Sequence, residues 1–329
     1  MTDSAANKLT AESWPITAAT LQFSDTTSAG ISMQDAAVDE WATVLREVRD
    51  AGFAHVDVFD SWLRPGDLSA SRLDDYLALT REVGIASPSI SAVRRSVIDA
   101  ESGEANLAYS HRTLEAAAHL GMRVVSFGLH QTLTPRQREQ LWFWTVEGHH
   151  DPVGDAHVWG LAVSRIRELG RHAAELGLIV SLEMYEDTYL GTAESAVRLV
   201  EEIGLDNVGI NPDLGNLVRL HRPIESWRDA LLRVLPYANY WHVKNYQRDE
   251  DVARDWYTAT PSPMPFGIID YRWALETAIS FGFQGILCTE HYGGDGLSVA
   301  AFNQDYLRSQ VLPRTSDYAL GQSRVRQQH

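Results

Sequence analysis

Two apolar runs constrain the fold of this chain more than any other feature, and each has a carboxylate residue at or near its C-terminal end. They lie within residues 178–216, where the run LIVSLEM carries Glu183 near its end and the run NVGIN shortly precedes Asp213. Helical spacing of apolar residues over Ala193–Ile203 separates the two runs, and Gly204 stands where a helix would stop. Continuous apolar runs joined by a helix are typical of buried parallel strands. The two carboxylates are therefore expected at matching ends of neighbouring strands.

The same pattern recurs along the whole chain and predicts a (β/α)8 barrel. Strands are expected at Thr17–Phe23, Ala54–Phe59, Ile85–Ser91, Val124–Leu129, Leu178–Met184, Asn207–Asn211, Tyr240–Lys244 and Gly285–Glu290. Helices are expected at Ala37–Asp50, Ser71–Val83, Glu104–Leu120, His157–Leu176, Ala193–Ile203, Ile224–Leu235, Tyr271–Phe281 and Val299–Leu312. Eight such units favour a single α/β TIM barrel over residues 1–313 rather than an open, doubly wound sheet. The polar C-terminal tail, residues 314–329, is expected to fray.

Two connections are too long for plain turns. Gln131–Asp155, after the fourth strand, contains LWFWTVEG, and Tyr246–Gly267, after the seventh strand, contains WYTATPSPMPFG. Long loops in compact domains usually bind ligands or act as lids, and loops that follow strands lie on the face where barrel active sites are found. The alternative is that the aromatic residues of these connections only cover the barrel mouth or form a subunit interface, namely Trp142, Phe143, Trp144 and Trp256.

Charge and composition exclude several classes of partner. Asp and Glu number 44 against 28 Lys and Arg, and the resulting net charge of −16 opposes binding to nucleic-acid phosphates or anionic membranes. No apolar run has the length of a signal segment or a membrane span. The single cysteine, Cys288, cannot form an internal disulfide and suits a reducing compartment. A cytoplasmic protein without nucleic-acid or membrane partners is expected.

Four expected strand ends carry side chains that can bind a metal ion. The fifth to eighth strands have, within two residues of their C-terminal ends, Glu183, Asp213, His242 and Glu290. Converging at one barrel mouth, these groups would carry about three negative charges, which a partly desolvated site cannot hold without a cation. Oxygen ligands with one nitrogen favour Mn²⁺, Mg²⁺ or Co²⁺ over a thiolate-type zinc site. For any one of the acids alone, a solvated cap or an ion-pair partner is the simpler account.

This order of side chains resembles that of the xylose-isomerase-like superfamily of sugar phosphate isomerases and epimerases, over nearly the whole chain. The resemblance implies that the four residues bind Mn²⁺ or a similar ion, which holds a ketone and a neighbouring hydroxyl of the sugar. It also implies a substrate-binding role for Arg248, six residues beyond His242. Two positions differ, because Asn216 and Tyr189 stand where ketose 3-epimerases carry a histidine and a glutamate that hold the ketose. Plain ketose epimerisation is therefore not the favoured reaction.

Three further motifs resemble a narrower family. They are EMYEDTYLGTAESAVRLVEEIG (183–204), NPDLGNLVRLHRPIESW (211–227) and LWFWTVEG (141–148). All three are similar to the large subunit of the two-subunit bacterial C-glycoside deglycosidases, which cleave the carbon–carbon bond between sugar and aglycone in 3-oxo-C-glucosides. The resemblance implies a lyase reaction, a small β-rich partner subunit and a higher hetero-oligomer.

Carbonyl chemistry is compatible with such a reaction. A ketone at C3 makes the C2 proton acidic, a divalent cation on the ketone oxygen stabilises the enolate, and a base removes the proton. The enolate then expels the C1 substituent, provided that the leaving aryl carbon is protonated. The base is expected among His149, His150, Glu183 and Glu290, with His130 as a weaker option. Substrate contacts are expected at Lys244, Arg248, Asn216 and His130. The alternatives are exposed positions beside acids for the two loop histidines and a buried ion pair for Lys244.

Three functions remain open from the sequence. The first is a metal-dependent lyase that cleaves C-glycosides together with a second subunit. The second is a metal-dependent ketose isomerase, epimerase or inosose dehydratase that acts alone on a free sugar or sugar phosphate. The third is a sugar-binding protein or a DNA-repair relative of the same barrel, and the net charge of −16 opposes a role on DNA.

Overall fold

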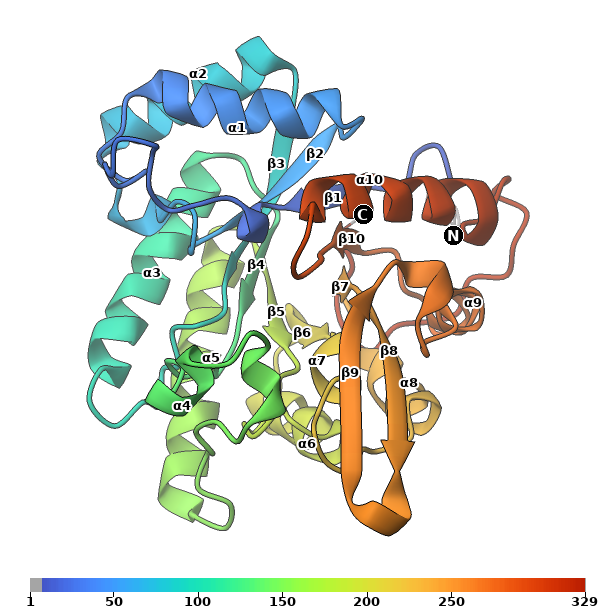
Figure 1. Ribbon diagram of the computed structural model, residues 1–329. Coiled ribbons are helices and arrows are strands. Elements are labelled where there is room, and N and C mark those ends of the chain that lie inside the picture. Colours follow the sequence, from blue (N-terminus) through green and yellow to red (C-terminus); the bar gives the residue numbers. More distant parts are fainter. Residues whose placement is uncertain (1–7, 329) are drawn as a thin grey trace, which may run out of the picture.

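Eight parallel strands form a nearly closed barrel in the computed structural model, which describes residues 8–328 (Figure 1). The strands are β1 (Ile16–Ala19), β2 (His55–Phe59), β3 (Ala86–Ala92), β4 (Val124–Phe127), β5 (Ile179–Glu183), β6 (Val208–Asn211), β7 (Tyr240–Val243) and β10 (Ile286–Thr289). Their order is β6-β5-β4-β3-β2-β1-β10-β7. The sheet closes between β6 and β7 through a single bridge, Ile210 to Ala238, and a 2.7 Å bond from the His242 N–H to Asn211 Oδ1. The predicted TIM barrel is confirmed.

Helices surround the barrel and cover the outer face of the sheet (Figure 1). The long ones are α1 (Val38–Asp50), α2 (Ala70–Val83), α3 (Gly103–His119), α5 (Ala156–Glu175), α6 (Ala193–Ile203), α8 (Trp227–Val234), α9 (Tyr271–Ser280) and α10 (Gly296–Tyr306). Two short ones, α4 (Pro135–Arg138) and α7 (Gly215–Val218), lie in connections. Helix α6 shows how the sequence sets such boundaries. The Thr192 hydroxyl accepts the Ser195 N–H at its start, and Gly204 ends it with a left-handed φ of 67°.

The connection after β7 differs from the expected open loop. It forms an antiparallel hairpin of β8 (Asn245–Asp251) and β9 (Trp256–Ser262), which projects from the barrel (Figure 1). Sequence reasoning missed the hairpin because β8 is rich in acidic residues and β9 contains Pro261, both of which are unfavourable in strands. The turn is made by Asp255, whose φ of 52° lies in the left-handed region.

The C-terminal tail does not fray, so that part of the sequence prediction is wrong. Its backbone follows the start of the strands, where the Arg324 N–H donates to the Pro236 carbonyl at 2.9 Å. The Gln328 side chain donates to the Asn239 carbonyl at 2.7 Å and accepts the Ile286 N–H at 3.2 Å. Polar composition misled the prediction because these side chains satisfy backbone groups that the barrel leaves open at its N-terminal end.

No helix within residues 8–328 is long and apolar enough to cross a membrane. The apolar residues instead fill the space inside the barrel and between the barrel and its helices. Strand β5, for example, is buried at all five of its positions. This is the pattern expected of a parallel strand that is covered on both faces.

Candidate functional site

Four side chains meet at the C-terminal ends of β5, β6, β7 and β10. They are the same four residues that the sequence predicts at the strand ends. Glu183 closes β5, Asp213 follows β6, His242 lies on β7 and Glu290 follows β10. His242 is at the centre of the group. Its Nδ1 lies 2.9 Å from Glu183 Oε2, 3.5 Å from Glu290 Oε2 and 3.8 Å from Asp213 Oδ2. All four side chains are buried.

Each member of this group has one buried polar atom that forms no hydrogen bond, although His242 Nδ1 and Glu183 Oε2 make an ion-pair contact at 2.9 Å. These atoms are Glu183 Oε2, Asp213 Oδ1, His242 Nδ1 and Glu290 Oε2. Buried polar atoms in native proteins almost always have partners, so four orphans in one place require an explanation. Donor atoms of Glu183, Asp213 and His242 all lie within 4.8 Å of one another, close enough to share one ion. These three residues fit a divalent cation with oxygen and imidazole ligands, and Glu290 Oε2, 3.5 Å from His242 Nδ1, lies beside them. The set does not fix which ion.

Neighbouring residues fix the orientation of the group. His242 Nε2 lies 3.1 Å from both Ser91 Oγ and the Tyr240 hydroxyl, and that hydroxyl donates to Asp57 Oδ1 at 2.8 Å. With Nε2 occupied in this way, Nδ1 is left for the acids or for a metal. On the opposite side, the Asn216 amide donates to Glu183 Oε1 at 3.0 Å and to Asp213 Oδ2 at 3.2 Å.

Positive charge inside the protein partly balances the three carboxylates. Lys244 Nζ lies 2.7 Å from Asp213 Oδ2 and 2.8 Å from Glu290 Oε1, so the buried ion pair considered from the sequence is present. Burial raises the pKa of Asp213 to about 7 despite the opposing Lys244 ammonium. Burial would lower the pKa of His242, but the facing Glu183 carboxylate outweighs it and raises the pKa to about 9. Protons and an ammonium thus offset part of the negative charge of the three carboxylates.

The three histidines predicted as bases occupy different environments. His130 is only 2% exposed, lines a pocket with Glu183 and Glu290, and has Nε2 3.4 Å from Glu183 Oε1. Burial lowers its pKa to about 4, despite Glu183. His149 and His150 lie exposed on the loop after β4, outside that pocket. His150 contacts Glu147 and Asp187 at 2.8 and 3.4 Å. The structure therefore brings His130 to the carboxylates and leaves the other two away from them.

Arg248 also lies outside the pocket, although the family resemblance implies a substrate contact for it. Its guanidinium donates to the carbonyls of Val218, Leu220 and Arg222, and pairs with Glu250 at 2.8 Å. These bonds fasten hairpin strand β8 to the segment that follows α7.

A second arginine, Arg219, lies near the mouth and was not found from the sequence. It is buried, lies 3.1 Å from Glu186 Oε1, and faces the rings of Trp144 and Phe143 at 4.8 and 4.9 Å. Tyr292, Tyr185 and Tyr246 complete this aromatic surround at 5.5–6.0 Å. The only sequence signal was a charged residue inside the otherwise apolar stretch LVRL (217–220). Nothing in that stretch indicates five rings from four other segments.

The loop after β4 extends across the mouth to the loop after β10. Phe143 and Trp144 pack on Tyr292, with ring centroids 5.9 and 5.6 Å apart, and Trp142 lies so close to Gly293 that a Cβ there would clash. The pocket beneath, lined by His130, Glu183, Glu290, Arg94, Tyr185, Tyr292 and five others, has a volume of only about 40 Å³. Sites for small organic ligands usually measure about 300 Å³ or more, so this pocket is smaller than such sites.

Comparisons with known proteins extend over most of the chain. A family profile described as xylose isomerase-like TIM barrel matches residues 45–310. A crystal structure of a xylose isomerase-like TIM barrel protein from Mycobacterium smegmatis, in complex with magnesium, is 44% identical. That similarity covers 91% of this chain and 97% of the other, with a TM-score of 0.87.

Two sugar epimerases are more distant. A D-psicose 3-epimerase from Agrobacterium fabrum is 26% identical over 183 residues, which are 54% of this chain and 56% of that protein. The match therefore spans little more than half the length of this relative. A crystal structure of a 3-keto-D-glucoside 4-epimerase from E. coli is 16% identical, with a TM-score of 0.62 over 90% of this chain and 99% of that one. At this identity the likeness shows the fold alone.

Proposed function

We propose that this chain, which belongs to the xylose isomerase-like TIM barrel family, is a divalent-metal-dependent enzyme that removes a proton beside a sugar carbonyl. One observation carries the proposal. Glu183, Asp213, His242 and Glu290, from four strand ends, each have a buried polar atom without a hydrogen-bond partner, and each of the three acids has an oxygen within 3.8 Å of His242 Nδ1. The relative from Mycobacterium smegmatis forms a complex with magnesium, which supports a divalent ion in this chain as well.

The residues around the site divide the work of such a reaction. A divalent cation, when bound, supplies a Lewis acid that stabilises negative charge on the carbonyl oxygen of the substrate. Lys244 and Asn216 hold the outer oxygens of the carboxylates, which leaves one oxygen of each for the ion. His130, whose buried Nδ1 has no partner, and Glu290 line the pocket and are placed to accept the proton.

For the substrate, we propose a 3-oxo-C-glycoside whose bond from sugar carbon to aryl carbon is broken. The base takes the C2 proton, the C1–aryl bond breaks, the aryl carbon takes up a proton, and the sugar leaves as an enone. The aromatic wall of Phe143, Tyr185 and Tyr292 beside the pocket supports an aryl substituent, because such rings stack on one another. The proposal includes manganese, magnesium or cobalt as the ion, and a small β-rich second subunit in a higher hetero-oligomer.

A second candidate is a metal-dependent isomerase, epimerase or inosose dehydratase that acts on a free sugar or sugar phosphate. The match to the D-psicose 3-epimerase from Agrobacterium fabrum favours it. The same proton abstraction serves both candidates, and they differ in the next step. The enolate expels an aryl carbon in the first candidate, whereas in the second it is reprotonated or loses a hydroxyl group as water.

One experiment separates the two. The chain is purified alone and together with the product of its neighbouring gene, and each preparation receives an aryl 3-oxo-C-glucoside or a free ketohexose with Mn²⁺, Mg²⁺ or EDTA. We expect aglycone release only with the second subunit and a divalent ion. Epimerised ketohexose from the lone chain, without aglycone release from the complex, would overturn the lyase proposal in favour of the second candidate.

Matched histidine variants test the assignment of the base. His130→Asn changes a residue of the pocket, whereas His150→Asn makes the same change on the exposed loop. We expect a fall in kcat of about 100-fold or more for the first and little change for the second. A large loss for His150→Asn with little change for His130→Asn would instead assign the base to the loop residue His150.

A further inference from the structure

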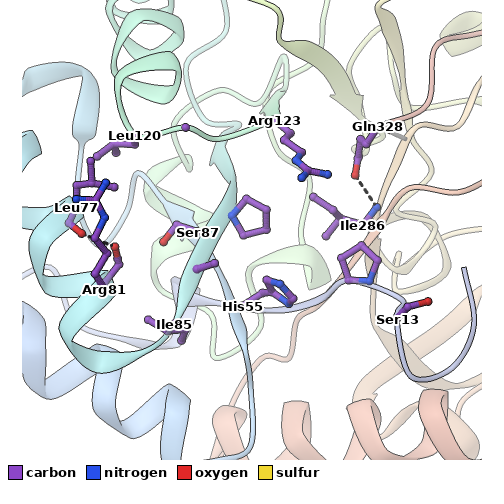
Figure 2. Close-up of a pocket in the computed structure, with 15 residues that line it drawn as sticks. Ser13, His55, Leu77, Arg81, Ile85, Ser87, Leu120, Arg123, Ile286 and Gln328 are labelled. Carbon is purple, nitrogen blue, oxygen red and sulfur yellow. Dashed lines mark hydrogen bonds between the residues drawn. The ribbon is translucent and has the colours of Figure 1, made fainter. Parts of the chain in front are cut away.

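A second cavity lies at the other end of the barrel, where the strands begin (Figure 2). His55, Ala86 and Ile286 are the first residues of β2, β3 and β10, and Arg123 directly precedes β4. Glu183, by contrast, is the last residue of β5. The cavity measures about 440 Å³, which is within the range for small-molecule sites. It is therefore larger than the pocket at the mouth and separated from it by the length of the strands.

Its lining is positively charged in a strongly acidic protein. Arg81 and Arg123 lie on either side of Ser87 in Figure 2, and none of the fifteen lining residues is Asp or Glu. Within residues 8–328, neither guanidinium forms an ion pair or a side-chain hydrogen bond. Both side chains are exposed, so a ligand in the cavity can reach them. Two cations that face one cavity without partners favour an anionic ligand.

The third basic residue contributes hydrogen-bonding capacity. Burial and the nearby Arg308 lower the pKa of His55, so its ring is neutral at pH 7 and the positive charge belongs to the two arginines. The His55 Nδ1 atom is buried and has no hydrogen-bond partner. A polar group of a ligand in the cavity could form the hydrogen bond that this ring nitrogen lacks.

Ser13, Thr80 and Ser87 add hydroxyl groups to the wall, and the cavity also has an apolar part. It consists of Pro15, Leu77, Ile85, Pro88, Leu120 and Ile286, while the ordered tail closes one side through Gln328. An inorganic ion alone would leave this apolar surface in contact with water. The combination fits a ligand with a compact hydrocarbon or ring body and an anionic group.

We propose that this cavity at the start of the strands binds a small organic anion that carries a phosphate or a carboxylate. The anionic group lies between Arg81 and Arg123, and the apolar body lies against Ile286 and Leu120. The site is distinct from the metal-ligand group at the mouth, and the proposal holds whichever reaction occurs there.

The full-length protein is titrated with three probes that share one body: cyclohexyl phosphate, cyclohexanecarboxylate and cyclohexanol. Binding is followed by calorimetry and by the rise in unfolding temperature, at constant ionic strength set with KCl. We expect saturable 1:1 binding of at least one anion at millimolar concentration and no binding of the alcohol. Stronger binding of the phosphate or of the carboxylate identifies which anionic group the cavity takes.

Arginine variants place the binding in the cavity. Arg123→Gln and Arg81→Gln should each weaken the anion by about tenfold or more, as expected for the loss of a charge-assisted hydrogen bond. Arg49→Gln is the matched control, because Arg49 is exposed on α1, outside the cavity. No binding of either anion, equal binding of the alcohol, or an equal loss in the Arg49 variant would overturn the proposal.

Discussion

Positive charge lies at both ends of the barrel, but only the mouth supplies negative charge to match it. At the mouth, Arg219 pairs with Glu186, and Lys244 pairs with Asp213 and Glu290, all of them buried. At the start of the strands, the arginines of the cavity are exposed and unpaired. Buried charges must be compensated within the protein, whereas water solvates exposed charges, which therefore stay available to a ligand. The paired charges at the mouth hold its side chains in a fixed geometry. The unpaired arginines at the start of the strands are instead suited to reversible binding of an anion.

The largest expected effect is the loss of turnover on changing a metal ligand. Glu290→Gln keeps the size of the side chain but replaces a carboxylate oxygen that has no protein partner. Loss of Lewis-acid stabilisation is worth several kcal/mol, so kcat should fall by about a thousandfold or more. The measurement is steady-state turnover with saturating Mn²⁺, and circular dichroism verifies that the fold is retained. Full activity in this variant would show that the mouth does not work through these ligands.

Removal of the buried ammonium tests the charge balance of the mouth. Lys244→Met leaves Asp213 and Glu290 without their cation, which should lower the free energy of unfolding by about 3–5 kcal/mol in EDTA. A divalent ion should restore more stability to this variant than to the unchanged protein, because it replaces the missing charge. Urea unfolding with and without Mg²⁺ measures both quantities. A loss no greater than that of Arg198→Met, a surface ion pair with Glu202, would contradict the account.

Variants of one arginine from each end of the barrel compare the contribution of the two ends to stability. Arg219→Met leaves Glu186 buried and alone, so a loss of about 3 kcal/mol or more is expected in urea unfolding. The double variant with Glu186→Gln should recover part of this loss. Arg123→Gln removes no ion pair, and its effect on stability should stay within about 0.5 kcal/mol in the absence of ligand. Similar losses in both single variants would remove the distinction between the two ends.

The smallest expected effect concerns pH and the loop that covers the mouth. Burial raises the pKa of Asp151 to about 6, although the Tyr189 N–H donates to this carboxylate at 2.8 Å. A carboxyl group with a raised pKa stabilises the folded state when protonated, and this contribution is lost as pH rises from about 4 to about 6. Asp151→Asn should therefore gain stability relative to the unchanged protein over that range, by about 2 kcal/mol. A difference between the two proteins that does not vary with pH would exclude this titration.

The four side chains at the strand ends were predictable because parallel strands place their C-terminal ends together. Glu183 and Glu290 therefore meet although 107 positions separate them. The barrel itself followed from eight repeats of one pattern. Arg219 was not predictable, because its role depends on rings that come from four other segments. The hairpin and the ordered tail were missed because their stability comes from contacts with the barrel rather than from local propensity. The cavity at the start of the strands has no sequence pattern at all.

The most direct test of the metal centre is anomalous diffraction from crystals of this protein soaked in Mn²⁺. We predict one strong peak in contact with the four orphan atoms, Glu183 Oε2, Asp213 Oδ1, His242 Nδ1 and Glu290 Oε2, and no peak there in crystals of His242→Ala. A map without a peak among these four atoms, or with manganese bound only elsewhere, would contradict the account.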